Sequence, residues 1–112
     1  MTQTPGEDFV QLLTPEGRRI DDQRYCFAGD DADVSEYLRQ MVLARRLDAE
    51  ATALQRKGEL ALWPPLLGQE AAQVGSAAAV RMPDEVVPSY REHAVALSLG
   101  IDPIGLLFAN TC

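Results

Sequence analysis

The stretch that decides the fold is ELALWPPLLGQEAAQVGSAAAVRMPDEVVPSYREHAVALSL, residues 59–99. It contains the only tryptophan of the chain, directly followed by two prolines. Pro64 and Pro65 cannot continue a helix, because proline lacks a backbone N–H and restricts the residue before it. Trp63 is therefore expected to anchor the core beside a turn, with stacking on a ligand as the alternative.

Small side chains follow the proline turn and predict a helix over residues 68–81. Alanine, glycine and serine there would let another backbone approach closely. Gly75 in the middle of a helix costs about 1 kcal/mol relative to alanine, so a packing reason for it is expected. The pattern predicts a helix that lies deep in a larger assembly. Glu70 falls in its first turn, where the helix dipole favours a negative charge.

A polar cluster, YREH, occupies residues 90–93. Ser89 and Glu92 have the spacing of a capping box, which predicts that a helix begins at this point. Tyr90 and Arg91 would then lie in the first turn, where free backbone N–H groups and the helix dipole favour an anion. The sequence thus predicts a phosphate-binding corner, with the alternative that Arg91 pairs with a neighbouring glutamate.

The clearest helical pattern precedes this stretch, over residues 34–57. Its apolar residues recur every three or four positions: Tyr37, Met41, Ala44, Leu47, Ala51 and Leu54. Asp33 with Glu36 resembles a capping box at the start of this helix. Gly58 suits the position just after its end.

Three further charged or titratable side chains, two on the predicted helix of residues 34–57 and one in the polar cluster, have open roles. Arg45 and Arg46 are adjacent and point in different directions, so they are expected to be solvated or paired with Asp48 and Glu50. His93 is the only histidine and a natural acid–base candidate. Its expected place is the surface of the helix.

Acidic residues concentrate at the start of the chain. The net charge is −7, and residues 1–34 hold eight of the seventeen acidic residues but only three of the ten basic ones. This segment is expected to be an extended acidic arm. An acidic chain lacks the basic surface that nucleic-acid binding needs. The sequence has no secretory signal and no membrane-spanning run, so Cys26 and Cys112 are expected to be reduced thiols of a cytoplasmic protein.

A further helix is expected near the end of the sequence. Gly100 ends the preceding helix, and Asp102-Pro103 has the pattern of a cap followed by proline in the first turn. The strongly apolar residues 104–108 follow. Because the sequence stops at Cys112, this helix is expected to be cut off from a longer protein.

Three segments, in this order, resemble one enzyme family. They are GELALWPPLLGQEAAQVGSAAA (58–79), VVPSYREHAVAL (86–97) and LGIDP (99–103). The preceding MVLARRLDAEATALQRKGEL is also similar to that family. The family is the E1 alpha subunit of thiamine-diphosphate-dependent 2-oxo acid dehydrogenases, which are the decarboxylating components of the pyruvate and branched-chain 2-oxo acid dehydrogenase complexes.

The resemblance implies a fold, an activity and partners. The fold would be mostly α here, as the N-terminal helical part of an α/β thiamine-diphosphate-binding fold. The activity would be oxidative decarboxylation of a 2-oxo acid, with acyl transfer to a lipoyl group on the E2 acyltransferase core. The family works as an α₂β₂ heterotetramer with the E1 beta subunit. Tyr90 and Arg91 match the family's Tyr-Arg pair, which holds the diphosphate end of the cofactor.

One family feature has no counterpart in this sequence. The family binds Mg²⁺ and the diphosphate through a GDG…N segment, and the chain has no GDG. The Mg²⁺ ligands are therefore expected outside this chain. Asp84-Glu85 is no substitute, because it lacks the glycine-rich backbone that approaches a phosphate. No catalytic residue is assigned.

Two domains and three functions follow as expectations. Residues 1–34 would be the arm, and 35–112 an incomplete start of the dehydrogenase domain. The first function is an E1 alpha fragment, inactive by itself. The alternative is a non-catalytic helical interaction module or relic that binds the E1 beta subunit. A small acidic helical domain unrelated to the family is the third.

Overall fold

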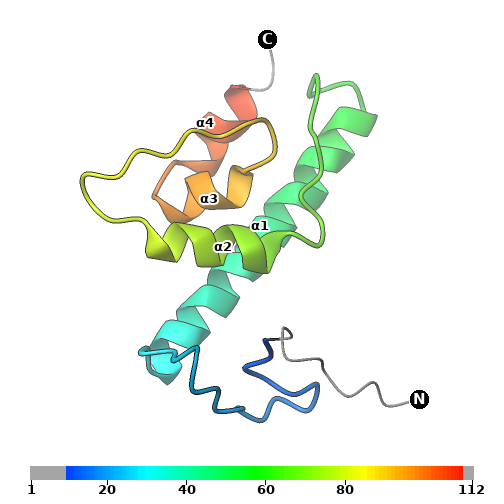
Figure 1. The fold of residues 1–112 in the computed structure, drawn as a ribbon. Coiled ribbons are helices and arrows are strands. Elements are labelled where there is room, and N and C mark those ends of the chain that lie inside the picture. The colour runs from blue at the N-terminus through cyan, green and yellow to red at the C-terminus, as the bar shows by residue number, and fades with distance from the viewer. Residues whose placement is uncertain (1–9, 110–112) are drawn as a thin grey trace. The chain divides into compact units, whose positions relative to one another are not determined.

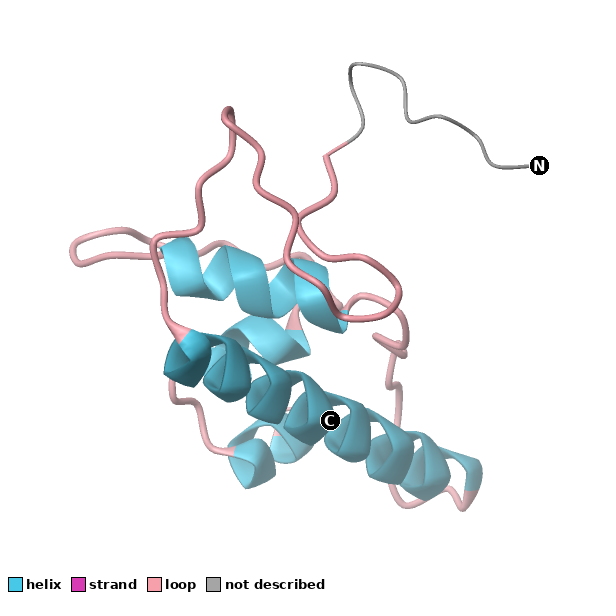
Figure 2. Cartoon of the chain, turned by 90° about the horizontal axis from the view of Figure 1, so that it is seen from below, coloured by secondary structure: helices cyan, strands magenta, loops and turns pink. Residues whose placement is uncertain are grey.

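The computed structural model describes residues 10–109 of the 112-residue chain. The chain divides into two units, with the boundary between Asp30 and Asp31, and the second unit contains four helices (Figure 1). Residues 10–109 contain no extended sheet, only two isolated bridges, so the prediction of a mostly helical chain is confirmed (Figure 2). None of the described helices is long and apolar enough to span a membrane.

The described part of the first unit contains two tight turns, where the sequence predicted an extended arm. In the first turn, the Gly17 N–H donates to the Thr14 carbonyl at 2.9 Å. Gly17 has φ 79°, which only glycine adopts without strain. In the second, the Tyr25 N–H donates to the Asp22 carbonyl at 3.2 Å. The first nine residues of the predicted arm lie outside the described residues.

The first helix, α1 (Asp31–Arg56), begins earlier than the predicted residue 34. Asp31 and Asp33 lie in its first turn, where the helix dipole stabilises negative charge. The predicted capping box of Asp33 and Glu36 is wrong, because Asp33 lies inside the helix. The last acidic residues assigned to the predicted arm, Asp31 and Asp33, instead start the helix.

Glycines in the left-handed conformation end two of the helices, as predicted. Gly58 (φ 76°) follows α1 and Gly100 (φ 90°) follows α3 (His93–Ser98). After α1, the Glu59 N–H donates to the Leu54 carbonyl at 3.0 Å, and the equivalent bond is present after α3. This is the Schellman pattern, which satisfies carbonyl groups that the helix end leaves without partners.

The other two helices are α2 (Glu70–Ala79) and α4 (Pro103–Phe108). The predicted start of α4 is confirmed, because the Asp102 carboxylate accepts a hydrogen bond from the Gly105 N–H at 3.1 Å. In the second unit, α1, α2 and α3 all pack against one another (Figure 1).

Two clusters of buried side chains form the core of the second unit. The first contains Ala44, Leu66, Val74 and Ala94, with Tyr37, Met41 and Leu97 packed against them. The second contains Ala51, Leu60 and Trp63, with Leu47, Leu54 and Leu107 packed against them. All six apolar residues predicted for the inner face of α1 belong to one of these clusters. Trp63 is 1% exposed, so its prediction as a core anchor is confirmed.

The small residues of α2 lie mostly on the surface of the described chain. Only Glu70, Gln73, Val74 and Ala77 of this helix are buried. A Cβ atom added to Gly75 would meet no atom within 4 Å, so no part of the described chain packs closely on it. The prediction that this helix lies deep in a larger assembly stays a prediction.

Candidate anion-binding site

Tyr90 and Arg91 lie in a turn that precedes α3. The helix begins at His93 with Glu92 at its N-cap, so the predicted helix start at Ser89 is wrong. The cause is the Glu92 carboxylate, whose Oε2 accepts the backbone N–H groups of Ser89 at 2.8 Å, Tyr90 at 3.1 Å and Arg91 at 3.2 Å. The predicted contact between Ser89 and Glu92 exists, but it closes this turn.

The Glu92 carboxylate also changes how the turn can bind an anion. The backbone N–H of Arg91, followed by the N–H and hydroxyl of Ser89, holds the pKa of Glu92 below its ordinary value. Glu92 is therefore charged at neutral pH and occupies three N–H groups that the sequence had left free for phosphate. An external anion at this place has to bind side chains.

The side chains of Tyr90 and Arg91 lie next to each other. Tyr90 is 65% exposed, and the Arg91 Cζ lies 5.3 Å from the centre of its ring, within the range of a cation–π contact. Arg91 Nε is buried and has no hydrogen-bond partner among residues 10–109. In the same described part, Arg91 forms no salt bridge with Glu85 or Glu92.

The unpaired Arg91 Nε is the feature of the Tyr90–Arg91 pair that bears on anion binding. A buried donor without a partner is costly, and a charge-assisted hydrogen bond to a phosphate oxygen would satisfy it. The guanidinium also brings a full positive charge to a half-exposed position. An unpaired guanidinium donor beside the Tyr90 ring is compatible with an anion, and the phosphate-binding corner stays a prediction.

Gln73 on α2 holds the same turn from the core side. It is 7% exposed. Its Nε2 donates to the Arg91 carbonyl at 3.1 Å, and its Oε1 accepts the Ala94 N–H at 3.0 Å. No sequence motif marks this residue, although its place three positions after Glu70 puts it on the same buried face of the helix.

His93 lies in the core, so the prediction of a surface histidine is wrong. It is 7% exposed, and its ring stacks on that of Trp63 with 4.0 Å between centroids and 15° between planes. Because α3 begins only at His93, this side chain leaves the first turn on the buried face. Burial lowers the pKa of His93, against the opposing effects of the Asp48 charge and a hydrogen bond to the Pro64 backbone.

Asp48 is a buried carboxylate that the sequence analysis had expected to pair with an arginine. It is 4% exposed, and its Oδ1 accepts the Trp63 Nε1–H at 2.8 Å and the Leu66 N–H at 3.0 Å. Its position, four residues after Ala44 and three before Ala51, places it on the inner face of α1. That spacing is the signal that predicts its burial.

The two adjacent arginines of α1 have different partners. Arg46 pairs with Glu50 at 2.5 Å, as the sequence predicted. Arg45 instead binds Glu70 on α2 at 2.8 Å. Glu70 also accepts the Gly68 N–H at 3.0 Å. These contacts, with the Arg45 bond the strongest, lower the pKa of Glu70, so the helix dipole is not the whole reason for its position.

No metal site can be assigned within residues 10–109. This part of the chain contains no group of three or more His, Cys, Asp or Glu side chains that could hold a metal ion. Asp84 is used locally, because its carboxylate accepts the Arg81 N–H at 2.8 Å.

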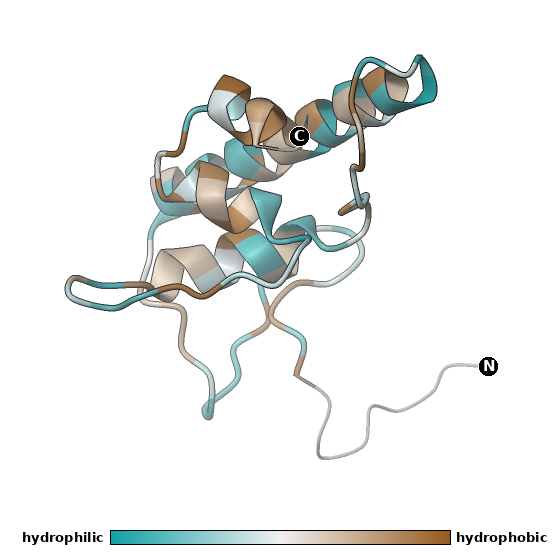
Figure 3. Cartoon of the chain, turned by 90° about the horizontal axis from the view of Figure 1, so that it is seen from above, coloured by the Kyte–Doolittle hydropathy of each residue, from teal (hydrophilic) through white to brown (hydrophobic). Residues whose placement is uncertain are grey.

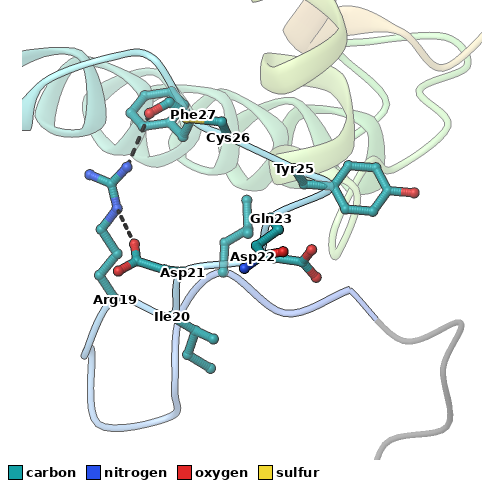
Figure 4. A pocket seen from close by; sticks show the side chains of 9 residues that line it. Arg19, Ile20, Asp21, Asp22, Gln23, Tyr25, Cys26 and Phe27 are labelled. Carbon is teal, nitrogen blue, oxygen red and sulfur yellow. Dashed lines mark hydrogen bonds and ion pairs between the residues drawn. The ribbon is translucent and has the colours of Figure 1, made fainter.

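The first unit contains a pocket of about 340 Å³ (Figure 4). Arg19 lies at its side, donates to the Phe27 carbonyl at 3.0 Å and lies 3.9 Å from the Asp21 carboxylate. Cys26, which also lines the pocket, is an exposed free thiol, and Cys112 lies outside the described residues. Because Arg19 has partners within the pocket, its charge does not point to a ligand.

A groove of about 410 Å³ lies between α3 and the loop of residues 80–92. Hydrophilic and hydrophobic parts alternate along this loop (Figure 3). The apolar lining includes Val80, Met82, Val86, Pro88, Val95 and Leu99. Glu92 also borders the groove, but its carboxylate is held by the turn.

Comparison with known proteins identifies the family. The profile of the family described as Dehydrogenase E1 component matches residues 38–111. The chain is 43% identical over 104 residues to the 3-methyl-2-oxobutanoate dehydrogenase subunit alpha of Mycobacterium tuberculosis H37Rv, covering 91% of this chain and 28% of that protein. No solved structure gives a significant match.

Two further relatives have a different substrate in their names. Pyruvate dehydrogenase E1 component subunit alpha of Bacillus cereus is 34% identical over 83 residues, covering 74% of this chain and 22% of the relative. The subunit of the same name from Staphylococcus aureus Mu50 is 33% identical over 85 residues, covering 76% and 23%.

The chain thus belongs to the dehydrogenase E1 component family, and its relatives named above are alpha subunits of 2-oxo acid dehydrogenases. It spans about 28% of the length of the mycobacterial relative.

Proposed function

We propose that this chain contributes the cofactor-anchoring pair of a thiamine-diphosphate-dependent E1 alpha subunit. The observation that supports this most directly is the buried Arg91 Nε, which has no partner in the described chain and lies beside the exposed Tyr90. The family membership supplies a ligand with matching chemistry, because a diphosphate accepts charge-assisted hydrogen bonds from a guanidinium.

The proposed reaction is oxidative decarboxylation of a 2-oxo acid, with transfer of the acyl group to a lipoyl group on E2. Thiamine diphosphate, when bound, supplies the carbanion chemistry. In this chain, Arg91 would bind and orient the anionic end, and the Tyr90 hydroxyl would donate a second hydrogen bond. Mg²⁺ would be held by residues outside the described part, and no acid or base is assigned here.

The proposed partners are the E1 beta subunit, in an α₂β₂ heterotetramer, and the lipoyl acyltransferase E2. The proposed location is the cytoplasm. Two substrate classes stay in the proposal, pyruvate and the branched-chain 2-oxo acids, because both occur in the names of the relatives.

The test is a titration of the full 112-residue chain with inorganic diphosphate and with thiamine diphosphate, followed by NMR at the Arg91 Nε–H. Both ligands are expected to shift this resonance, and Arg91→Ala is expected to weaken binding by about 1.5–3 kcal/mol. Arg46→Ala is the control, because Arg46 pairs with the exposed Glu50. Arg45→Ala is unsuitable, since it would leave buried Glu70 without its partner. Equal affinities of the Arg91 and Arg46 variants would contradict the proposal.

A non-catalytic interaction module is the second candidate function. The exposed alanine and glycine surface of α2 favours it, because small side chains allow another backbone to approach closely. This function predicts that the chain binds the E1 beta subunit with unchanged affinity in the Arg91→Ala variant. It also predicts that diphosphate does not change that affinity.

A further inference from the structure

The Gln73 side chain bridges two points of the backbone that surround the anion site. Its Nε2 donates to the Arg91 carbonyl at 3.1 Å and to Gln69 Oε1 at 3.1 Å. Its Oε1 accepts the Ala94 N–H at 3.0 Å. Both amide protons and the amide oxygen are thus used, in a position that is 7% exposed.

Only an amide side chain of this length can make these contacts. A carboxylate has no proton for the Arg91 carbonyl, and an apolar side chain of similar size would leave both backbone groups without a partner. The Ala94 N–H belongs to the first turn of α3, where the helix itself offers no acceptor. Gln73 therefore caps α3 from α2 with the same group that holds Arg91.

The Arg91 backbone is held from both sides. Its carbonyl is bound by Gln73, and its N–H donates to Glu92 at 3.2 Å. With the backbone fixed in this way, the freedom left to Arg91 is that of its side chain. Through Gln73, α2 thus fixes the backbone position from which the Arg91 side chain extends.

We infer that Gln73 is a positioning residue for the anion site, acting through the Arg91 backbone; this rests on the proposed function. The residue does not itself contact the diphosphate. Gln73 fixes the backbone position from which the Arg91 side chain reaches the diphosphate. Less conformational freedom is then lost when the anion binds.

The experiment uses the full chain and inorganic diphosphate. Gln73→Met is expected to weaken diphosphate binding about five- to tenfold and to move the Arg91 Nε–H resonance before ligand is added. Gln40→Met is the matched control, because the side-chain hydrogen bond of Gln40 goes to Glu36 on α1, at 2.9 Å. It is expected to change neither quantity.

A second variant and a measurement on the unchanged chain cover the case in which Gln73→Met does not fold. Gln73→Glu keeps the size and the acceptor for Ala94, but it loses the donors to Arg91 and Gln69 and adds a negative charge. It is therefore also expected to weaken binding, and Gln73→Met is the variant that separates positioning from charge. In the unchanged chain, diphosphate is expected to shift the side-chain amide resonances of Gln73 and to leave those of Gln40 in place.

The outcomes separate the two proposals. If the unchanged chain does not bind diphosphate, the proposed function fails, and the role of Gln73 fails with it. If the unchanged chain binds while a folded Gln73 variant binds equally well, only the positioning role is overturned. Unmoved Gln73 amide resonances on binding overturn it as well.

Discussion

At the scale of single residues, two contacts fix the orientation of the buried aromatic pair of Trp63 and His93. Asp48 accepts the indole N–H, as a buried tryptophan requires, and this fixes the rotation of the ring. The fixed indole then presents a flat face on which the His93 imidazole stacks. A polar residue from α1 thereby sets the place of an aromatic pair that joins the proline turn to α3.

The buried imidazole predicts a stability that depends on pH. Because burial lowers the pKa of His93, the unfolded chain binds a proton more readily than the folded one. The free energy of unfolding should therefore fall as pH drops below about 6.5. His93→Phe keeps a flat ring and cannot be protonated, so it should lose this dependence.

The measurement is urea unfolding of both proteins between about pH 7.5 and about pH 5.5, a window above the ordinary titration of carboxylates. His93 is the only histidine, so no other imidazole contributes. Parallel pH profiles for the unchanged chain and the variant would contradict the prediction.

At the scale of elements, local signals predicted most of the helices. The apolar spacing of α1, the glycine after it and the Asp-Pro start of α4 each depend on residues close in sequence. The start of α3 was predicted wrongly, because Ser89 and Glu92 at this spacing fit both a helix cap and a turn closed by a carboxylate. Which geometry forms depends on how α3 packs on Trp63, and sequence spacing does not contain that information.

The candidate site was predicted in the same partial way. The motif singled out Tyr90 and Arg91, and their role at a phosphate site stays a prediction. Their location in a turn and the bond from Gln73 to the Arg91 carbonyl depend on contacts between distant segments. The hydrogen bonds of Gln73 join residues 18 and 21 positions apart. No pattern within one helix specifies such partners.

Two glycines give opposite predictions for the same substitution. Gly58 has φ 76°, so Gly58→Ala should destabilise the chain by about 1 kcal/mol. Gly75 is helical and a Cβ there meets nothing within 4 Å, so Gly75→Ala should stabilise it by about 1 kcal/mol. Urea midpoints of the two variants measure both effects. A stabilised Gly58→Ala variant would contradict the first prediction, and a destabilised Gly75→Ala variant would contradict the second.

At the scale of the whole molecule, the exposed face of α2 is a surface on which a further part of a longer relative could pack. The chain spans about 28% of the mycobacterial relative, and Gly75 has an open surface above it. If a further segment or subunit packs there, Gly75→Ala should stabilise the isolated chain and weaken that contact. Stability and assembly would then select different residues at one position.

The chain by itself is predicted to have no dehydrogenase activity. It supplies the proposed anchoring pair for the cofactor, whereas the relatives' activity belongs to proteins more than three times as long. The assay contains residues 1–112, thiamine diphosphate, Mg²⁺ and E1 beta subunit, and measures 2-oxo acid decarboxylation. The expected rate equals that of the control without the chain. Turnover above this control would show that 112 residues contain a sufficient alpha subunit.

The stacking of His93 on Trp63 also gives the chain an optical property. An excited indole transfers an electron to a protonated imidazole far more readily than to a neutral one, and this transfer quenches its emission. With a single tryptophan and a single histidine, the indole fluorescence, excited at a wavelength that the three tyrosines do not absorb, has one emitter and one imidazole quencher, with 4.0 Å between the ring centroids. Its brightness therefore reports the protonation of a core residue without any attached dye.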